Sequence, residues 1–281
     1  MRRVHAATLV GATLVGATLV GACLAGACGA SAQEASDLAK QVANPVSSLI
    51  SVPFQYNYNG GIGPQDGSQN YVNIQPVVPF SLNGSWNLIL RTIVPVIDQH
   101  DVVPGTGAQF GLGDTTQSLF LSPKKPGPGG LIWGVGPAFL WPTATEEELG
   151  AGKWGAGPTG VALVQKGPWT YGMLANHIWS FADAGDDDRP FYNQTFVQPF
   201  LAYNTPSAWT YTLNSESTYN WTTHDWSIPI NAIVTKTTHL GKQPVQLGVG
   251  ARYWVHTPES GPEGWGARAV LTFLLPTGKS S

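Results

Sequence analysis

Residues 209–220 read WTYTLNSESTYN, a stretch in which apolar and polar side chains alternate with a period of two. Trp209, Tyr211 and Leu213 fall on one face, whereas threonines, asparagines and Glu216 fall on the other. Such alternation is typical of a β-strand whose two faces meet different environments. The stretch therefore predicts one strand of a sheet with an apolar face and a polar face.

The same pattern recurs, with varying clarity, from about residue 48 to the C-terminus. The other predicted strands are 50–58, 71–80, 86–97, 110–122, 131–141, 153–165, 169–180, 191–203, 226–235, 244–256 and 265–274. An even number of segments of ~10 residues is what a transmembrane barrel requires. The expected fold is all-β, an antiparallel transmembrane β-barrel of about 12 strands with a short N-terminal helix.

The connections between these strands alternate strictly in length. Short ones are expected at 82–85, 123–130, 166–168, 204–208 and 240–243, and longer ones at 59–69, 98–109, 142–152, 181–190, 220–225 and 256–263. Outer-membrane barrels of Gram-negative bacteria have tight periplasmic turns and longer outer loops. A secreted soluble β-sandwich, the alternative fold, has no reason to keep this alternation.

The positions of the charged residues and of the tryptophans both follow the pattern of short and long connections. Lysines border the short turns, and nearly every carboxylate falls in a long loop. All 11 tryptophans lie near predicted strand ends, which favours two aromatic girdles at the membrane boundaries. The alternative is a plain preference of tryptophan for strand ends and sandwich cores.

Composition excludes several classes of protein. Charged residues make up 11% of the chain, against ~25% in an ordinary soluble domain. The mean hydropathy is −0.04, and no run after residue 32 approaches the ~18 apolar residues of a transmembrane helix. The chain is acidic without a basic stripe, so no nucleic-acid partner is expected.

Residues 1–32 resemble an export signal, with Arg2 and Arg3 before an apolar stretch and Ala30-Ser31-Ala32 as the cleavage site. An uncleaved anchor, or lipidation at Cys23 or Cys28, are the alternatives. Residues 33–47 are expected to form a helical segment, either a plug in the lumen or a periplasmic helix. The barrel is expected over 48–275, followed by a tail over 276–281.

Several stretches carry a family resemblance: DLAKQVANPVSSLISVPFQYNYNGGIGP (37–64), NIQPVVPFSLNGSWNLILRTIVPVI (73–97), and GLGDTTQSLFLSP with LIWGVGPAFLWPTAT (111–145). Together with GKWGAGP (152–158) and LGKQPVQLGV (240–249), they resemble a family of bacterial outer-membrane proteins named after the meta-pathway of phenol degradation. Its members are labelled transporters and are often misannotated as neuromedin U.

The resemblance implies an outer-membrane barrel that passes small organic or aromatic compounds, and it supplies no catalytic residues. Its partners would be outer-membrane lipid, lipopolysaccharide and the barrel-assembly machinery. Such barrels typically end on an aromatic residue that this machinery recognises. Here the chain continues through Pro276 to Ser281, so the assembly signal departs from the pattern.

The polar faces of the strands should line the lumen. The expected pore-lining residues are Arg91, Arg252, Arg268, Glu216, Gln55, Asn73, Gln75 and Asn214. Three arginines against one carboxylate predict a mildly cationic interior that favours anions or carboxylate-bearing solutes. The alternative is an internal ion-pair network that fills a narrow barrel.

Prolines 76, 79, 95, 199 and 229 fall inside predicted strands, where each removes a ladder hydrogen bond. We expect bulges there, and an opening in the wall is the alternative.

The sequence predicts no enzyme, no cofactor and no metal site, because the histidines are scattered and nucleophile or phosphate-binding motifs are absent. The function expected is a passive channel for small organic solutes, with aromatic or anionic ones as candidates. A non-conducting structural or surface-interaction barrel, and an outer-membrane hydrolase built around His177 or His224, are the alternatives.

Overall fold

The computed structural model describes residues 33–185 and 189–276. A helix over residues 33–42 precedes fifteen strand segments and three short 3-10 helices. The strands are β1 (Ile50–Ile62), β2 (Gly67–Ile74), β3 (Val77–Ser81), β4 (Trp86–His100), β5 (Ala108–Leu112), β6 (Thr115–Pro123), β7 (Leu131–Trp141), β8 (Lys153–Lys166), β9 (Trp169–Asp183), β10 (Asn193–Asn204), β11 (Trp209–Ser215), β12 (Ser217–Asn220), β13 (Asp225–Leu240), β14 (Gln243–His256) and β15 (Gly264–Leu275). The 3-10 helices are η1 (Gly63–Gln65), η2 (Pro128–Gly130) and η3 (Glu147–Leu149).

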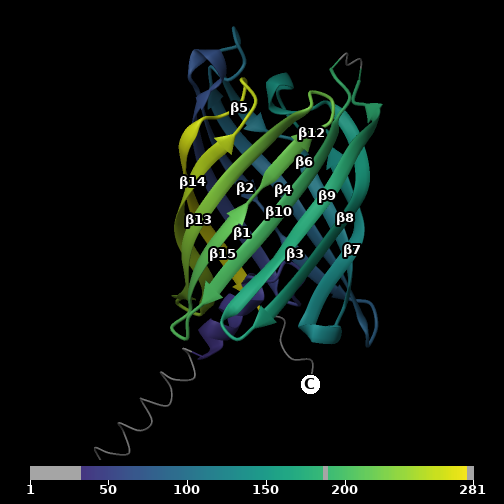
Figure 1. The fold of residues 1–281 in the computed structure, drawn as a ribbon, viewed down its shortest axis with the longest axis vertical. Coiled ribbons are helices and arrows are strands. Elements are labelled where there is room, and N and C mark those ends of the chain that lie inside the picture. Colours follow the sequence, from purple (N-terminus) through teal and green to yellow (C-terminus); the bar gives the residue numbers. More distant parts are fainter. Residues whose placement is uncertain (1–32, 186–188, 277–281) are drawn as a thin grey trace, which may run out of the picture.

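The segments form a closed antiparallel barrel of twelve strands, as the sequence predicts. β15 pairs with β1, which closes the sheet without a free edge (Figure 1). Three of the twelve strands are interrupted and therefore appear as two segments each, namely β2 with β3, β5 with β6, and β11 with β12. Closure satisfies the backbone polar groups that lipid cannot.

Irregularities occur at two of the five prolines, Pro76 and Pro229, whereas Pro79, Pro95 and Pro199 pair with a neighbouring strand without a register shift. Pro76 lies between β2 and β3, and the pairing of β13 with β14 shifts at Pro229. The break between β11 and β12 lies where Pro199 of β10 and Pro229 of β13 flank the strand on its two sides. Neither proline has an N–H to donate to the ladder, so the interruption follows from their chemistry.

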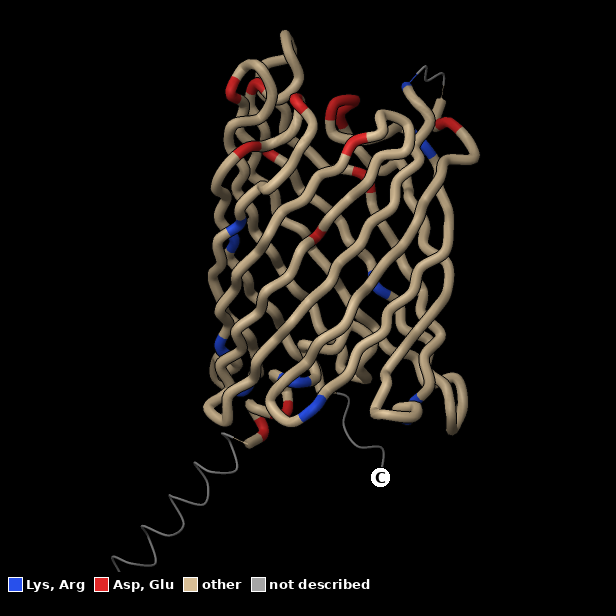
Figure 2. Tube along the Cα trace, viewed as in Figure 1, with Lys and Arg blue, Asp and Glu red and all other residues tan. Residues whose placement is uncertain are grey.

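The two ends of the barrel differ as expected. Turns between 82 and 85 and between 205 and 208 are tight and lie at the same end as the N-terminal helix (Figure 1). The longer loops lie at the opposite end, where the carboxylates gather (Figure 2). We call these the short-turn end and the long-loop end.

Strands extend further toward the long-loop end than the sequence suggests. The expected loop over 59–69 is largely strand, because β1 continues to Ile62 and β2 begins at Gly67. The expected loop over 98–109 is likewise shortened, since β4 reaches His100 and β5 begins at Ala108. β13 has 16 residues, more than the ~9–11 that cross a membrane, so the wall continues beyond the lipid.

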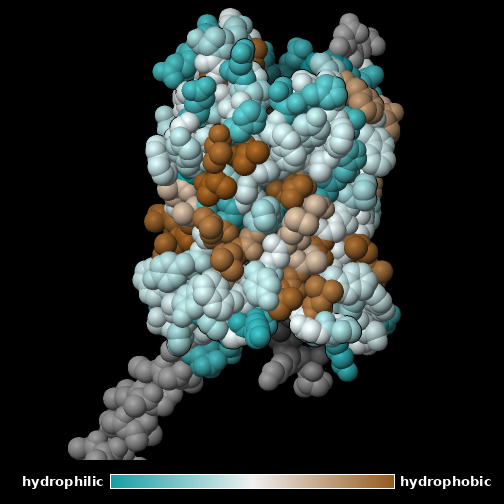
Figure 3. All heavy atoms as spheres, in the orientation of Figure 1, coloured by the Kyte–Doolittle hydropathy of each residue, from teal (hydrophilic) through white to brown (hydrophobic). Residues whose placement is uncertain are grey.

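The face of the outer surface seen in Figure 3 carries apolar residues across its middle, with polar residues toward both ends. Trp169 and Trp209 are exposed at the short-turn rim, and Trp179 and Trp221 are exposed near the long-loop rim. One assignment was wrong: Trp254 faces the lumen, where its Nε1–H donates to Asn59 Oδ1 at 3.2 Å. Arg252 lies two residues earlier in β14, and residues two apart in a strand point to the same side. The Trp254 side chain therefore points inward, as that of Arg252 does.

No helix in the described ranges is long and apolar enough to cross a membrane. The predicted signal segment 1–32 with Cys23 and Cys28, the acidic run Asp186–Asp188 and residues 277–281 of the tail lie outside the described residues.

Candidate functional site

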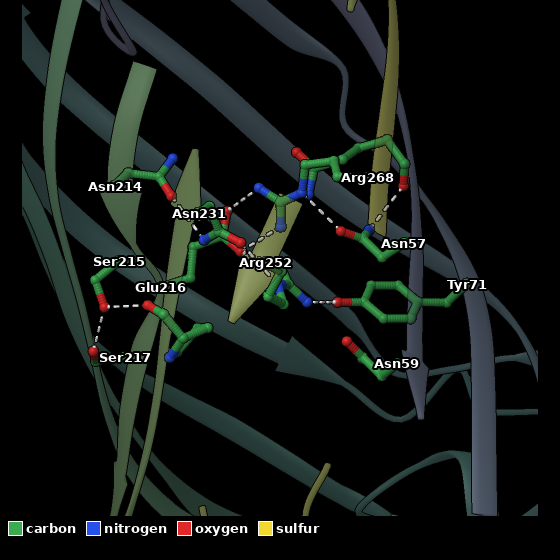
Figure 4. A network of polar contacts seen from close by, with 12 residues as sticks. Asn57, Asn59, Tyr71, Asn214, Ser215, Glu216, Ser217, Asn231, Arg252 and Arg268 are labelled. Carbon is green, nitrogen blue, oxygen red and sulfur yellow. Dashed lines mark hydrogen bonds and ion pairs between the residues drawn. The ribbon is translucent and has the colours of Figure 1, made fainter. Parts of the chain in front are cut away.

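A network around one carboxylate spans the middle of the lumen (Figure 4). Glu216 accepts hydrogen bonds from both terminal nitrogens of Arg268, at 3.0 and 2.7 Å, and from Arg252 Nη2 at 2.8 Å. The arginine side chains are only 3% (Arg252) and 1% (Arg268) exposed, whereas Glu216 is 21% exposed. Such charge-assisted, bidentate contacts are the strong class of hydrogen bond.

The remaining guanidinium donors in this network are also used. Arg252 donates to Asn231 Oδ1 at 2.8 Å and to the Tyr71 hydroxyl at 2.7 Å. Arg268 Nε donates to Asn57 Oδ1 at 2.8 Å. The partners come from β1, β2, β13, β14 and β15, which are neighbours in the barrel, so the network joins these strands to the strand that carries Glu216.

The sequence places Glu216 at this point through its neighbours. Glu216 lies in the one-residue gap between β11 and β12, with Ser215 and Ser217 on either side. These two hydroxyls contact each other at 2.7 Å, and Ser215 donates to the Pro229 carbonyl at 2.7 Å. The serines therefore satisfy polar groups where the prolines break the ladder, and the carboxylate between them points inward.

Arg91 on β4 forms no hydrogen bond with this network, although its charge lies within electrostatic reach of Glu216. Its Nη2 donates to Gln75 Oε1 at 3.1 Å, and it forms no ion pair with any carboxylate in the described ranges. The three lumen arginines and Glu216 together leave two positive charges in excess. Because Glu216 is engaged by Arg252 and Arg268, the accessible part of this excess is the Arg91 guanidinium.

Arg91 lines two lumen cavities. The lower one, of about 230 Å³, lies between Arg91 and the N-terminal segment. The upper one, of about 200 Å³, extends toward the long-loop end and includes Tyr192. Arg91 is the one charged side chain on the described lining of either cavity.

The upper cavity has a neutral wall apart from Arg91. Burial, and secondarily the negative charge of Asp114, raises the pKa of the Tyr192 phenol, in the loop before β10, to about 12. The phenol is therefore a neutral hydrogen-bonding group at the rim. The rest of the lining mixes polar side chains such as Gln194 with apolar ones such as Phe196.

One side of the lumen is apolar, which the sequence reasoning missed. Ile89, Phe120 and Leu163 are buried together with Val46, Val161 and Leu174, and Phe196 and Phe200 pack against them. β8 carries apolar residues on both faces, so its alternation does not show which face points inward. Its register with β9 places Val161 opposite Leu174, inside the barrel.

The N-terminal segment occupies the short-turn end of the lumen. Ser36 donates to the Thr205 carbonyl at 3.4 Å, and Gln165 Nε2 donates to the Lys40 carbonyl at 2.8 Å. Leu38 packs with Leu49, which precedes β1, and with Leu274 of β15. These contacts join the segment to the wall at the short-turn end.

The predicted pore-lining residues fall into three groups. Glu216, Arg252 and Arg268 form the network, and Asn214 joins it by accepting a hydrogen bond from Asn231 at 2.8 Å. Arg91, Gln75 and Gln55 line the lower cavity, as Asn214 also does. Asn73 pairs with Gln55 in the register of β1 and β2 and shares its inward face, but it does not line either cavity.

The structure brings no described group of three or more His, Cys, Asp or Glu residues together in a way that could hold a metal ion. His177, one of the two histidines considered for a hydrolase, faces lipid rather than the lumen, and its Nδ1 lies 2.8 Å from Thr195 Oγ1. His224 lies in the turn between β12 and β13 with a positive φ of 62°.

No family model and no curated protein matches the chain. Solved structures do match. An outer membrane channel from Pseudomonas putida F1 is 13% identical, with a TM-score of 0.63, over 81% of this chain and 96% of that one. Outer membrane phospholipase A from Escherichia coli is 10% identical, with a TM-score of 0.51, over 80% of this chain and 90% of that one. These similarities show the fold: the chain is a closed β-barrel of the kind seen in these outer-membrane proteins.

Proposed function

We propose that this barrel is a passive outer-membrane channel for small organic anions that have an apolar part, aromatic carboxylates being the candidate class. The observation that carries the proposal is Arg91, an unpaired guanidinium shared by two otherwise uncharged cavities. A carboxylate that passes from one cavity to the other must pass this group, which can bind it with two parallel hydrogen bonds.

The cavity walls support the proposal that the solute has an apolar part. Phe196 and Phe200 border the upper and lower cavities respectively, and both pack against the apolar side of the lumen. Volumes of about 200 and 230 Å³ lie below the ~300–1,000 Å³ of drug-sized ligand pockets, so the solute would be small. The resemblance to the phenol meta-pathway family supports aromatic compounds, and we propose membership of that family.

Engagement of Arg252 and Arg268 by Glu216 supports a divided role for the arginines. The ion-pair network acts as structural filling, and Arg91 acts on the solute. Internal ion pairing would then apply to Arg252, Arg268 and Glu216, and anion recognition would apply to Arg91.

The position of the N-terminal segment supports a second candidate function, that of a non-conducting barrel whose loops act at the surface. It occupies the short-turn end through few polar contacts, so a channel requires it to move or to leave a path beside it. Electrical conductance of the whole chain in a planar bilayer distinguishes the two functions.

The test of the channel is the reversal potential under a salt gradient, measured for the wild type, Arg91→Gln and Arg91→Lys. We expect anion preference in the wild type, its loss in Arg91→Gln and its retention in Arg91→Lys, which keeps the charge. Equal selectivity in all three proteins would refute the role of Arg91, and the absence of conductance in all three would refute the channel.

A further inference from the structure

An apolar groove of about 580 Å³ runs over the lipid-facing wall of β7 to β10. Small outward residues form its floor, namely Gly160 and Ala162 of β8 and Ala175 of β9. Val135 and Met173, which are 50% and 51% exposed, stand at its sides. The groove thus follows from a local absence of large side chains on a wall that is otherwise covered by them.

The groove ends at a polar group of defined geometry. His177 of β9 lines that end, and its Nδ1 lies 2.8 Å from Thr195 Oγ1 of β10. Trp221 Nε1 donates to the same hydroxyl oxygen at 2.8 Å. Indole nitrogen can only donate, so Thr195 accepts from Trp221 and its own hydroxyl proton is free to go to His177.

This chain of hydrogen bonds is consistent with one tautomer of His177, in which Nδ1 is the acceptor. When Nδ1 accepts from Thr195, the proton of the neutral ring lies on Nε2. No described residue forms a hydrogen bond with Nε2. In this tautomer the end of the groove presents an N–H donor on the outward face of the wall.

The position of this donor along the membrane normal indicates which leaflet would supply a lipid to the groove. His177 is two residues from Trp179 on the same outward face, and the two rings lie 5.1 Å apart. Trp179 and Trp221 belong to the girdle at the long-loop end, where acyl esters of the outer leaflet lie. From Pro158 to Ala162 the groove covers five residues of β8, a rise of about 13 Å, which is about half of a ~25 Å apolar band.

We propose that this groove is a binding site for one acyl chain of lipid A, the lipid of the outer leaflet, with its ester carbonyl accepting from His177 Nε2. An acyl chain fits the apolar floor in shape and polarity, and an ester oxygen fits the free donor at the correct end. A phospholipid of the inner leaflet would approach from the Trp133 end of the groove instead, away from this donor. The site is independent of what passes through the lumen.

Gly160→Leu is the variant that tests the groove. A β-carbon at Gly160 would meet only ordinary contacts, the nearest being Val135 Cγ1 at 3.7 Å, so the backbone tolerates the change while the side chain fills the groove. Ala175→Leu fills the same space from β9. Ala251→Leu is the matched control, since Ala251 faces outward from β14, is exposed and lies outside the groove.

The measurement is native mass spectrometry of the whole barrel in detergent, with purified lipid A or phosphatidylethanolamine as the added probe. We expect one lipid A bound per barrel, about tenfold weaker binding for Gly160→Leu and Ala175→Leu, and no change for Ala251→Leu; tenfold is the effect of losing the burial of about two methylenes. His177→Phe should also weaken lipid A binding. Heat-modifiable gel mobility verifies that each variant is folded.

The proposal is wrong if the folded groove variants bind lipid A as tightly as Ala251→Leu does. Equal losses in all three leucine variants would show unspecific annular lipid. Preferential retention of phosphatidylethanolamine would assign the groove to phospholipid and would also contradict the proposal.

Discussion

Replacing Glu216 with glutamine should destabilise the barrel strongly, because it removes the one carboxylate that Arg252 and Arg268 share. The change preserves the size of the side chain but leaves two almost fully buried guanidinium groups without a counter-charge. Breaking a buried ion pair from one side costs about 3–5 kcal/mol. Since Glu216 itself is 21% exposed to the lumen, we expect the lower limit, about 3 kcal/mol of unfolding free energy.

Urea unfolding in lipid vesicles, followed by tryptophan fluorescence, measures this loss. With a slope of about 3 kcal/mol per molar urea, the midpoint should fall by about 1 M. Asp98→Asn is the control, since Asp98 is 46% exposed at the long-loop end, and it should change stability by less than about 0.5 kcal/mol. In the double variant with Arg268→Gln, part of the loss should be recovered, with a coupling of about 1–3 kcal/mol.

A loss below about 1 kcal/mol for Glu216→Gln would refute the reasoning, because it is the size expected of an exposed pair. Additive losses in the double variant would refute it as well, since they would show that Glu216 and Arg268 do not act on each other in the folded barrel.

Three further changes test other parts of the structure. Deletion of residues 33–43 should increase single-channel conductance in a planar bilayer, because it removes the segment at the short-turn end; unchanged conductance would mean that the segment does not restrict the path. Phe120→Ala, at a fully buried position in the lumen, should cost about 3–5 kcal/mol in urea unfolding, whereas its lipid-facing neighbour Leu121→Ala should cost less, and equal costs would contradict the inward apolar cluster. Gly157→Val should prevent folding by collision of its β-carbon with the His177 carbonyl, and Gly160→Val should fold, as judged by heat-modifiable gel mobility.

Much of the fold could be predicted from sequence because the barrel repeats one rule twelve times. Strands such as β11 and β14 alternate cleanly, and the lengths of the connections give their orientation. The ends of strands were less certain. Asparagine, glutamine and glycine near residues 59–69 are typical of loops, yet their inward side chains hydrogen-bond across strands, as Gln69 does with Gln99 at 2.9 Å.

The candidate site could be predicted only in part. The alternation of inward and outward residues identified the arginines and Glu216. It could not show that Glu216 forms ion pairs with Arg252 and Arg268 but not with Arg91, because those contacts join residues far apart in the chain. The apolar side of the lumen was missed because β8 is apolar on both faces. The groove was missed because small residues on an outward surface carry no periodic signal in the sequence.

The central proposal, a channel that selects small anions with an apolar part, is tested most directly by solute flux into vesicles that contain the full chain. Benzoate and benzamide have nearly the same size and shape but differ in charge. After subtraction of the rate into protein-free vesicles, the proposal predicts that benzoate enters faster than benzamide, and that Arg91→Gln removes the difference while Arg91→Lys keeps it. Entry of neither compound above the rate of protein-free vesicles, or faster entry of benzamide, would contradict it.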